Sequence, residues 1–318
     1  MPRKSDLMTL YRVAKYCYKE GLTQKQIAAI ENLSRSQISR LLEKARQLGI
    51  VKISLHLPSE FEAGELSESI RQGLGLEKVI VAPVTSGDGN DNIKITQAIA
   101  IAAAEYLPEV VPEYRTVGIG WGRTIYETSH QLSYINSNPS LYLVPLIGMS
   151  GVDNPNLQIN AIIDRFCEKF RCRGLFTNIP TIRDKNLPLT KLEQERLSNL
   201  KSHWEELDMA IIGLGGPPDK TQTVISEFSD EYIGNITNKG ICGDILAQFF
   251  FPDGEIYDIN DSYDHVSFDI RKLKDIKSVI CLAGGVEKVN GIITAARSGF
   301  IKTLITDSIT ARHIFESL

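Results

Sequence analysis

Two helix-start signals, eleven residues apart, constrain the first part of this chain more than any other feature of its sequence. Thr23 is followed three residues later by Gln26, and Ser34 by Gln37. This is the spacing of a capping box, in which the hydroxyl accepts a hydrogen bond from a backbone amide and the glutamine side chain reaches back. Apolar residues at helical spacing follow each signal, so we predict two short helices. Asn32 between them is suited to a tight left-handed turn.

A further amphipathic segment, residues 7–19, precedes this pair and predicts a first helix. Two short helices joined by a tight turn form a helix-turn-helix unit. At about 100° per residue, the third helix turns Ile38 and Leu42 inward and presents polar residues outward. Arg and Gln match the hydrogen-bonding edges of guanine and adenine, whereas Ser and Lys mainly hold phosphates. The candidate DNA-contacting residues are Thr23, Gln24, Ser34, Arg35, Ser36, Gln37, Ser39, Arg40, Lys44 and Lys52.

Charge is distributed unevenly along the chain. Residues 1–57 contain eleven Lys and Arg against four Asp and Glu, a net charge of +7, whereas the remaining residues have a net charge of −11. A basic head on an acidic body predicts that the head binds a polyanion. The apolar run at residues 50–55 predicts a β-wing, with Lys52 placed for phosphate. The alternative is that the three helices only dimerise or dock on another protein; the charge excess, capping boxes and polar face together favour DNA.

From residue 58 onward, strand-length apolar runs alternate with longer amphipathic stretches. The runs lie at residues 79–81, 116–119, 141–147, 209–214, 279–283 and 303–305. The amphipathic stretches lie at residues 93–107, 157–170, 191–207 and 286–297. Such alternation predicts an α/β fold with a mainly parallel, doubly wound sheet covered by helices on both faces. We therefore expect a DNA-binding domain over residues 1–57 and a ligand-binding domain over residues 58–318.

Three of the predicted strands end in glycine turns, at residues 118–124, 213–216 and 283–288. In an open α/β sheet, ligands bind outside the carboxyl ends of the strands. Glycine lets backbone amides approach an anion, and Arg123 and Lys288 add positive charge. We expect the three turns to converge on one anion-binding cleft, although each alone is also compatible with a tight connection. The first turn lacks the Gly-Lys-Ser/Thr ending of a Walker motif, and its glycine spacing does not fit a dinucleotide fingerprint.

The sequence contains no recognisable catalytic or metal-binding arrangement. The five histidines lack metal-ligand spacing, and the five cysteines, which form no Cys-x-x-Cys pair, are interpreted as buried thiols. We therefore predict that the protein is not an enzyme and needs no cofactor or metal. The N-terminus lacks the apolar core of a signal peptide, and no run of about 18 apolar residues occurs. These features predict a cytoplasmic protein with no membrane partner.

Several segments together resemble one known family. Residues 21–28 and 33–42 are similar to the helix-turn-helix of the SorC family of sugar-responsive bacterial transcription regulators. The segments of the body that resemble this family's effector domain are residues 120–124, 243–250, 283–288 and 306–311. The segment at residues 203–208 looks most similar to the branch of sorbose/sorbitol operon regulators. The resemblance spans nearly the whole chain.

The resemblance implies a winged helix-turn-helix joined to a domain folded like sugar-phosphate isomerases. It also implies a homo-oligomer, dimer or tetramer, that binds operator DNA and responds to a phosphorylated sugar. Carried over by position, the loop at residues 120–124 and Lys288 would hold the phosphate, and Asp244 the sugar hydroxyls. The sequence departs from the family at Phe251, where Asp is common, and at residues 148–151, which lack adjacent glycines.

The resulting candidate effector-binding residues are Gly120, Trp121, Gly122, Arg123, Thr124, Gly148, Gly213, Gly215, Asp244, Gly284 and Lys288. A different class of protein remains as an alternative: a sugar-phosphate isomerase or deaminase that carries an accessory DNA-binding head. The absence of a recognisable general base argues against this alternative.

Overall fold

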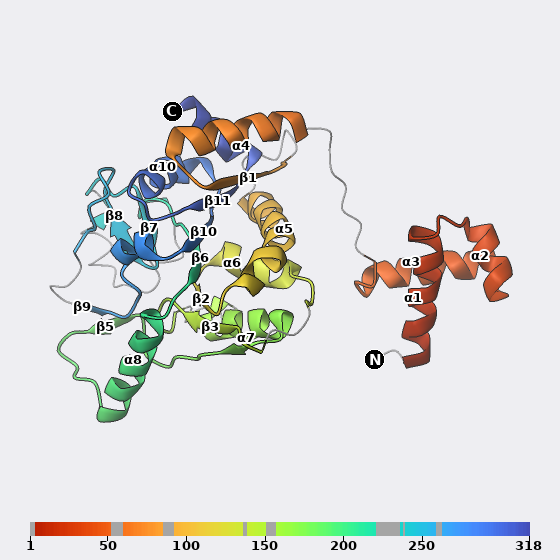
Figure 1. Ribbon diagram of the computed structural model, residues 1–318, viewed down its shortest axis with the longest axis horizontal. Coiled ribbons are helices and arrows are strands. Elements are labelled where there is room, and N and C mark those ends of the chain that lie inside the picture. Colours follow the sequence, from red (N-terminus) through yellow and green to blue (C-terminus); the bar gives the residue numbers. More distant parts are fainter. Residues whose placement is uncertain are drawn as a thin grey trace. The chain divides into compact units, whose positions relative to one another are not determined.

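The computed structural model describes residues 4–51, 60–84, 92–135, 139–150, 157–220, 236–237, 239–258 and 263–318 (Figure 1). The chain divides into two compact units, Met1–Leu57 and Pro58–Leu318, which we call the head and the body. Each unit has a hydrophobic core of its own.

The head consists of three helices, α1 (Lys4–Tyr18), α2 (Gln24–Glu31) and α3 (Arg35–Gln47). Both predicted capping boxes are present: the backbone N–H of Thr23 donates to Gln26 at 2.9 Å, and that of Ser34 donates to Gln37 at 2.8 Å. Asn32 ends α2 with a φ of 55°, as the turn prediction required. The helices pack around Val13, Ile27, Ile38 and Leu42. Of the predicted wing, residues 52–55, including Lys52, lie outside the described residues.

The body is built on a seven-stranded sheet in which every neighbouring pair of strands is parallel. Its strand order is β1-β11-β10-β6-β2-β3-β4. The strands are β1 (Lys78–Ala82), β2 (Thr116–Ile119), β3 (Tyr142–Pro145), β4 (Arg173–Gly174), β6 (Met209–Gly213), β10 (Ser278–Leu282) and β11 (Thr303–Asp307). The chain winds outward in opposite directions from β2 and from β6, which are neighbours. The boundary between β2 and β6 is therefore the topological switch point, where ligands bind in such sheets.

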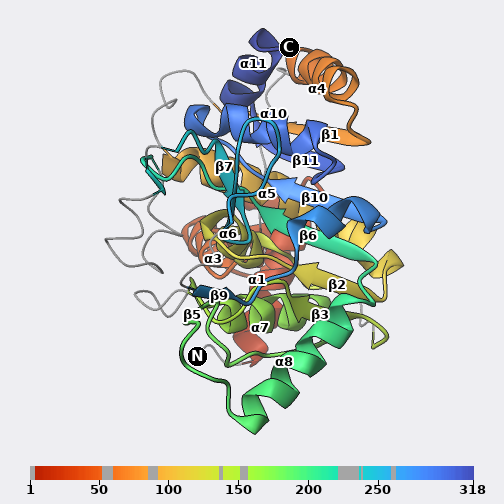
Figure 2. The same cartoon turned by 90° about the vertical axis from the view of Figure 1, so that its left-hand side faces the viewer.

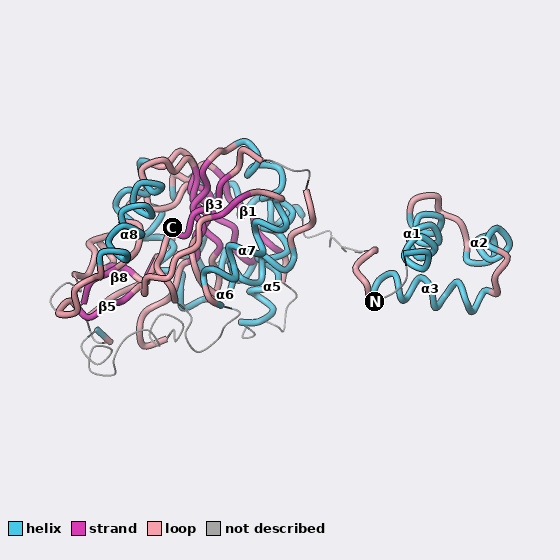
Figure 3. Tube along the Cα trace, turned by 90° about the horizontal axis from the view of Figure 1, so that it is seen from below, coloured by secondary structure: helices cyan, strands magenta, loops and turns pink. Residues whose placement is uncertain are grey.

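Helices cover both faces of this sheet (Figures 2 and 3). One face carries α5 (Asn92–Val110), α6 (Arg123–Gln131) and α7 (Ile159–Phe170). The other carries α4 (Glu60–Leu74), α8 (Lys191–Trp204), α10 (Val289–Arg297) and α11 (Ser308–Glu316). Successive side chains of a strand point to opposite faces of the sheet. Ile211 of β6 packs in the core beneath α5, α6 and α7, and Ile212 packs in the core beneath α4, α8, α10 and α11. This confirms the predicted α/β sheet with two covered faces.

Two short antiparallel pairs lie outside the main sheet and were not predicted: β5 (Ile182–Asp184) with β9 (Tyr263–His265), and β7 (Gly243–Ile245) with β8 (Gln248–Phe250). A two-residue turn joins β7 to β8, and its residues Leu246 and Ala247 have φ angles of 52° and 59°. Two positive φ angles are typical of the tight turns that match strand twist, but Asn and Gly usually occupy them. The sequence therefore carried no local signal for this hairpin.

The cysteines fit the sequence interpretation only in part. Cys242 and Cys281 are buried, as predicted. Cys17, Cys167 and Cys172 are half-buried, so the prediction was wrong for these three. All five are free thiols.

Candidate functional site

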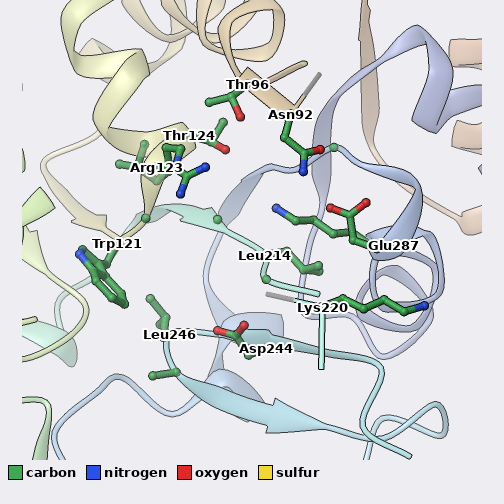
Figure 4. Close-up of a pocket in the computed structure, with 17 residues that line it drawn as sticks. Asn92, Thr96, Trp121, Arg123, Thr124, Leu214, Lys220, Asp244, Leu246 and Glu287 are labelled. Carbon is green, nitrogen blue, oxygen red and sulfur yellow. The ribbon is translucent and has the colours of Figure 1, made fainter. Parts of the chain in front are cut away.

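A cavity of about 290 Å³ opens at the carboxyl ends of β2, β6 and β10, beside the switch point of the sheet (Figure 4). Its size is near the lower end of the range for small-molecule sites. The predicted residues that line it are Trp121, Gly122, Arg123, Thr124, Gly213, Gly215, Asp244, Gly284 and Lys288. The three glycine turns therefore converge, as expected from the sequence.

The turn between β2 and α6 forms one wall. Gly122 has a φ of 130°, which residues with a side chain rarely adopt, and it immediately precedes Arg123, the first residue of α6. The N-terminal end of α6 therefore faces the cavity with its free amides and partial positive charge. Trp121 fixes the turn in place. Its indole N–H donates to the carbonyl of Leu157, and only 8% of the residue is exposed. Arg123 and Thr124 extend into the cavity (Figure 4).

The opposite wall carries a buried carboxylate. Asp244 lies on β7, which is joined to Gly215 by two backbone hydrogen bonds of 2.9 and 3.2 Å. Only 4% of Asp244 is exposed, and this burial raises its pKa to about 7, although Lys288 and the amide of Ala247 act in the opposite direction. Near neutral pH its carboxyl group can both accept and donate hydrogen bonds. Such a group is suited to a sugar hydroxyl.

Lys288 supplies a cation from the turn that follows β10. Burial lowers its pKa, while the nearby carboxylates of Glu287 and Asp244 act in the opposite direction. Burial therefore disfavours the charged form of the lysine, and its anionic neighbours favour it. With Arg123 on the other wall, it provides positive charge on two sides of the cavity. A ligand that brings a phosphate group would satisfy these cations and the free amides of α6.

Two predicted residues do not line the cavity. Gly120 packs against β6: its N–H donates to the carbonyl of Ile211 at 2.7 Å, and a Cβ atom there would lie 3.1 Å from that oxygen. Gly148 lies where a Cβ atom would come within 2.6 Å of the carbonyl oxygen of Ile179. Both glycines permit close approach of backbone to backbone, which accounts for a glycine at each position without a ligand.

Sequence reasoning also missed several lining residues. Asn92 and Thr96 reach the cavity from the first turns of α5, and Glu287 comes from the same turn as Lys288 (Figure 4). Lys220, in the segment that follows β6, adds a third cation. The polar pair at the start of α5 could have suggested a site, because that helix follows a strand of the parallel sheet. The remaining missed residues are Ile125, Leu214, Leu246 and Ala247.

Apart from Lys52, which lies outside the described residues, the predicted DNA-contacting residues of the head lie on α3 and at the starts of α2 and α3. Arg35, Arg40 and Lys44 are exposed, and none of them forms an ion pair within the described part of the chain. Ser36 and Ser39 are also exposed, and Gln24 and Thr23 lie at the start of α2, half-buried and exposed respectively. The cationic side chains of Arg35, Arg40 and Lys44 are therefore available to bind DNA phosphates.

The capping box restricts two of the predicted contacts. The side-chain oxygen of Gln37 accepts the N–H of Ser34, and the Ser34 hydroxyl accepts the N–H of Gln37 at 3.2 Å. Gln37 therefore retains only its amide NH₂ group for a base edge. Arg40, one turn further along α3, has no such competing bond among the described residues.

Neither a metal site nor a membrane span was found in the described residues. Their His, Cys, Asp and Glu side chains form no cluster of three or more that could hold an ion. None of the described helices combines the length and apolar character needed to cross a bilayer.

Comparison with known proteins places this geometry in a family. Residues 60–316 match the protein family described as "Putative sugar-binding domain". The chain belongs to this family. The match covers all but the last two residues of the described body and includes every residue of the cavity. Membership in the sugar-binding-domain family agrees with a cavity that combines cations and a buried carboxyl group.

Relatives that match over all or nearly all of their length are named as regulators. The chain is 26% identical over 321 residues to the sorbitol operon regulator of Klebsiella pneumoniae, an alignment that covers 99% of this chain and 100% of that protein. It is 28% identical over 317 residues to the transcriptional regulator LsrR of Escherichia coli K12, covering 96% and 94% of the two chains. The predicted resemblance to the SorC family is confirmed. These names also favour a regulator over the isomerase or deaminase alternative.

Solved structures share the fold. The full-length sorbitol operon regulator SorC from Klebsiella pneumoniae superposes with a TM-score of 0.78 at 24% identity, covering 98% of this chain and 100% of that chain. A transcriptional regulator from Streptococcus pneumoniae gives a TM-score of 0.71 at 21% identity, covering 81% of this chain and 98% of that chain. The first match includes the head, so the three-helix unit and the body occur together in a known regulator.

Proposed function

We propose that this protein is a sugar-responsive transcription regulator that acts in the cytoplasm. In this proposal the head binds double-stranded operator DNA, and the body binds a phosphorylated sugar in the cavity between β2, β6 and β10. The observation that carries it is the joint presence of Arg123, Lys288 and the start of α6 around one cavity in a sugar-binding-domain protein. The named regulators that align with the full chain support the DNA-binding part.

The assignment of a phosphorylated rather than a free sugar rests on electrostatics. The body has a net charge of −11, which repels an anionic ligand at long range. Two cations and the amides of a helix start can outweigh this repulsion at short range. A neutral sugar would supply no negative charge to Arg123 or to the free amides at the start of α6. The buried carboxyl group of Asp244 is proposed to bind hydroxyls of the same ligand.

A thermal-shift screen tests the ligand assignment. Phosphorylated hexoses and hexitols, each paired with its unphosphorylated parent, are added to the full-length protein. A ligand at about 100 times its Kd adds roughly 2.7 kcal/mol of stability, so a specific phosphosugar should raise Tm while its parent does not. Equal shifts with both members of a pair would contradict the phosphate assignment. Product formation from the phosphosugar would instead support the enzyme alternative.

The proposal includes self-association, because one short helix covers too few base pairs to select a single site in a genome. We propose a homo-oligomer, a dimer or a tetramer, that pairs two heads on a two-fold operator. Light scattering at micromolar concentration should therefore give at least twice the monomer mass of 35.4 kDa. A monomer with and without operator DNA would contradict this part of the proposal.

A further inference from the structure

A fully buried carboxylate lies behind the cavity, at the end of β11. Asp307 is 0% exposed and does not line the cavity. It accepts hydrogen bonds from the N–H groups of Ile309 and Thr310 at 2.9 and 3.0 Å, which cap α11, and from the Thr310 hydroxyl at 2.5 Å. A buried carboxylate needs several donors, and these three satisfy it.

Thr310 connects this carboxylate to the cavity. Its hydroxyl proton goes to Asp307, so its oxygen is left as an acceptor, and the N–H of Gly285 donates to it at 2.7 Å. Thr310 is 0% exposed, so water does not compete for either bond. Asp307, the Thr310 hydroxyl and the Gly285 amide thus form one directional chain of hydrogen bonds, which we call the relay.

The relay ends at the Gly284–Gly285 turn, which precedes the charged cavity residues Glu287 and Lys288. Gly285 has a φ of 117°, and at Gly284 a Cβ atom would lie 2.3 Å from a carboxylate oxygen of Asp307. The backbone of the turn is therefore pressed against the carboxylate on one side and bonded to Thr310 on the other. Glu287 and Lys288 follow within three residues and point into the cavity. A turn with an unusual φ needs such fixation to keep one conformation.

We propose that Asp307 and Thr310 are positioning residues that hold the Gly284–Gly285 turn in the conformation that places Lys288 in the cavity. Their role in ligand binding rests on the proposed function of the cavity, whereas their role in ordering the turn does not. Neither residue touches the ligand. The relay acts through the backbone, so its loss displaces the cation without removing any lining side chain.

Hydrogen exchange on the full-length, ligand-free protein tests the ordering of the turn. Thr310→Val keeps the shape of the side chain but removes the acceptor of the Gly285 N–H. We expect amides in a peptide covering residues 283–289 to exchange about 10-fold faster, because a buried hydrogen bond is lost. Thr310→Ser restores the hydroxyl and should restore slow exchange. Unchanged exchange in Thr310→Val, or no rescue by serine, overturns the proposal.

A matched control separates positioning from general loss of packing. Thr303 is a buried threonine too, 5% exposed, but it lies on β11 at the opposite end of that strand from Asp307. Thr303→Val should leave exchange at residues 283–289 as in the wild type. An equal increase in both valine variants would show that any buried threonine has this effect, and would overturn the relay.

Calorimetry with inorganic phosphate tests the consequence for binding. Thr310→Val should weaken phosphate binding about 10-fold relative to the wild type, while Thr303→Val and Thr310→Ser bind as the wild type does. Wild-type affinity in Thr310→Val would overturn the positioning role, whatever the exchange result. If the wild type bound neither phosphate nor any phosphosugar, the proposed function of the cavity would fail instead, and the exchange experiment alone would decide the relay.

Discussion

The carboxylate of Asp244 occupies the space that a side chain at position 215 would need. A Cβ atom built on Gly215 would lie 1.8 Å from an oxygen of this carboxylate. The two residues also exchange backbone hydrogen bonds, from Gly215 N–H to Asp244 C=O and in the reverse direction. The missing side chain at position 215 therefore permits the buried carboxyl group to stand in the wall of the cavity.

Gly215→Ala should damage both the stability of the body and its ligand binding. The methyl group displaces the Asp244 side chain, and overpacking of this kind costs about 1–3 kcal/mol. Both tryptophans, Trp121 and Trp204, lie in the body, so urea unfolding followed by tryptophan fluorescence measures this unit alone. Gly64→Ala is the control: it lies in α4 with nothing within 4 Å of its Cβ position, and it should stabilise by about 0.5–1 kcal/mol. If Gly215→Ala and Gly64→Ala changed the free energy of unfolding equally, the inferred clash with Asp244 would be wrong.

Asp244→Asn should change how the stability of the body depends on pH. Burial raises the folded-state pKa of Asp244 to about 7, above its ordinary value of about 3.9. Below pH 4 the carboxyl group is protonated in both the folded and the unfolded state, so its ionisation does not change the free energy of unfolding. As pH rises from 4 to 7, Asp244 ionises in the unfolded chain before it ionises in the folded protein, so the free energy of unfolding of the wild type falls. The total loss, complete above pH 7, is at most about 4 kcal/mol.

Asparagine cannot ionise, so the variant escapes this loss. Urea titrations at pH 4 should give similar stabilities for Asp244→Asn and the wild type, while at pH 8 the variant should be the more stable. A difference that is constant across this pH range would show that Asp244 does not titrate as inferred. The same variant should bind phosphosugar less well at pH 8, because asparagine replaces a charged acceptor of hydroxyl protons.

The parts of the structure that could be predicted from the sequence depend on local signals. The capping boxes at Thr23 and Ser34 determine helix starts within four residues, and both helices begin where these signals place them. The glycine turns after β2, β6 and β10 are equally local, and a parallel sheet necessarily brings its carboxyl ends to one edge. The convergence of Arg123, Gly215 and Lys288 on one cavity followed from these signals and the topology.

What could not be predicted depends on contacts distant in sequence or on unusual local conformation. Asp244 lies on the short strand β7, which pairs with β8 because Leu246 and Ala247 turn the chain with positive φ angles, and neither residue type predicts such a turn. Asn92 lies about thirty residues before Arg123 and reaches the same cavity only because α5 packs against α6. Gly148 was predicted as a ligand contact but lies outside the cavity lining, because a close backbone contact and a ligand contact both favour glycine.

Arg40→Ala should reduce both the affinity of the head for DNA and its sequence preference. Arg40 is exposed on α3, and an arginine that reads guanine contributes roughly 1–3 kcal/mol of discrimination. Lys15→Ala is the control, because it removes the same charge from α1, where Lys15 pairs with Glu20 at 3.4 Å. Footprinting and salt titration measure the two effects. Unchanged operator preference in Arg40→Ala would exclude this residue as a base reader.

Gln37→Ala should mainly lower the stability of the head, because its side chain completes the capping box of α3. Loss of an N-cap costs about 0.5–2 kcal/mol, and Gln37→Ala should cost less because the N-cap Ser34 still accepts the N–H of residue 37. The DNA affinity of the full-length protein is measured at several temperatures. A loss of affinity in Gln37→Ala that grows with temperature identifies an effect on the stability of the head. A loss of sequence preference at constant affinity would instead assign Gln37 to base reading.

Lys288→Met should abolish the response to a phosphosugar while leaving DNA binding without effector intact. Methionine keeps much of the length and apolar character of lysine but removes the charge, so the effect isolates electrostatics from packing. Lys288 is half-buried and interacts with the carboxylates of Glu287 and Asp244, and the loss of its charge removes one of the three cations that line the cavity. A charge-assisted hydrogen bond is worth roughly 1.5–3 kcal/mol, which corresponds to about a 10- to 150-fold loss of affinity.

Lys220→Met provides the matched control in the same cavity. Lys220 also lines the cavity, but it is exposed, so solvent screens its charge and its loss should weaken binding far less. Calorimetry with the phosphosugar identified by thermal shift, and with its unphosphorylated parent, measures both variants. Because the head is a separate compact unit, operator affinity in the absence of sugar should be the same in Lys288→Met, Lys220→Met and the wild type. If Lys288→Met responds as the wild type does, the phosphate lies elsewhere, and the turn after β10 serves only to connect strand and helix.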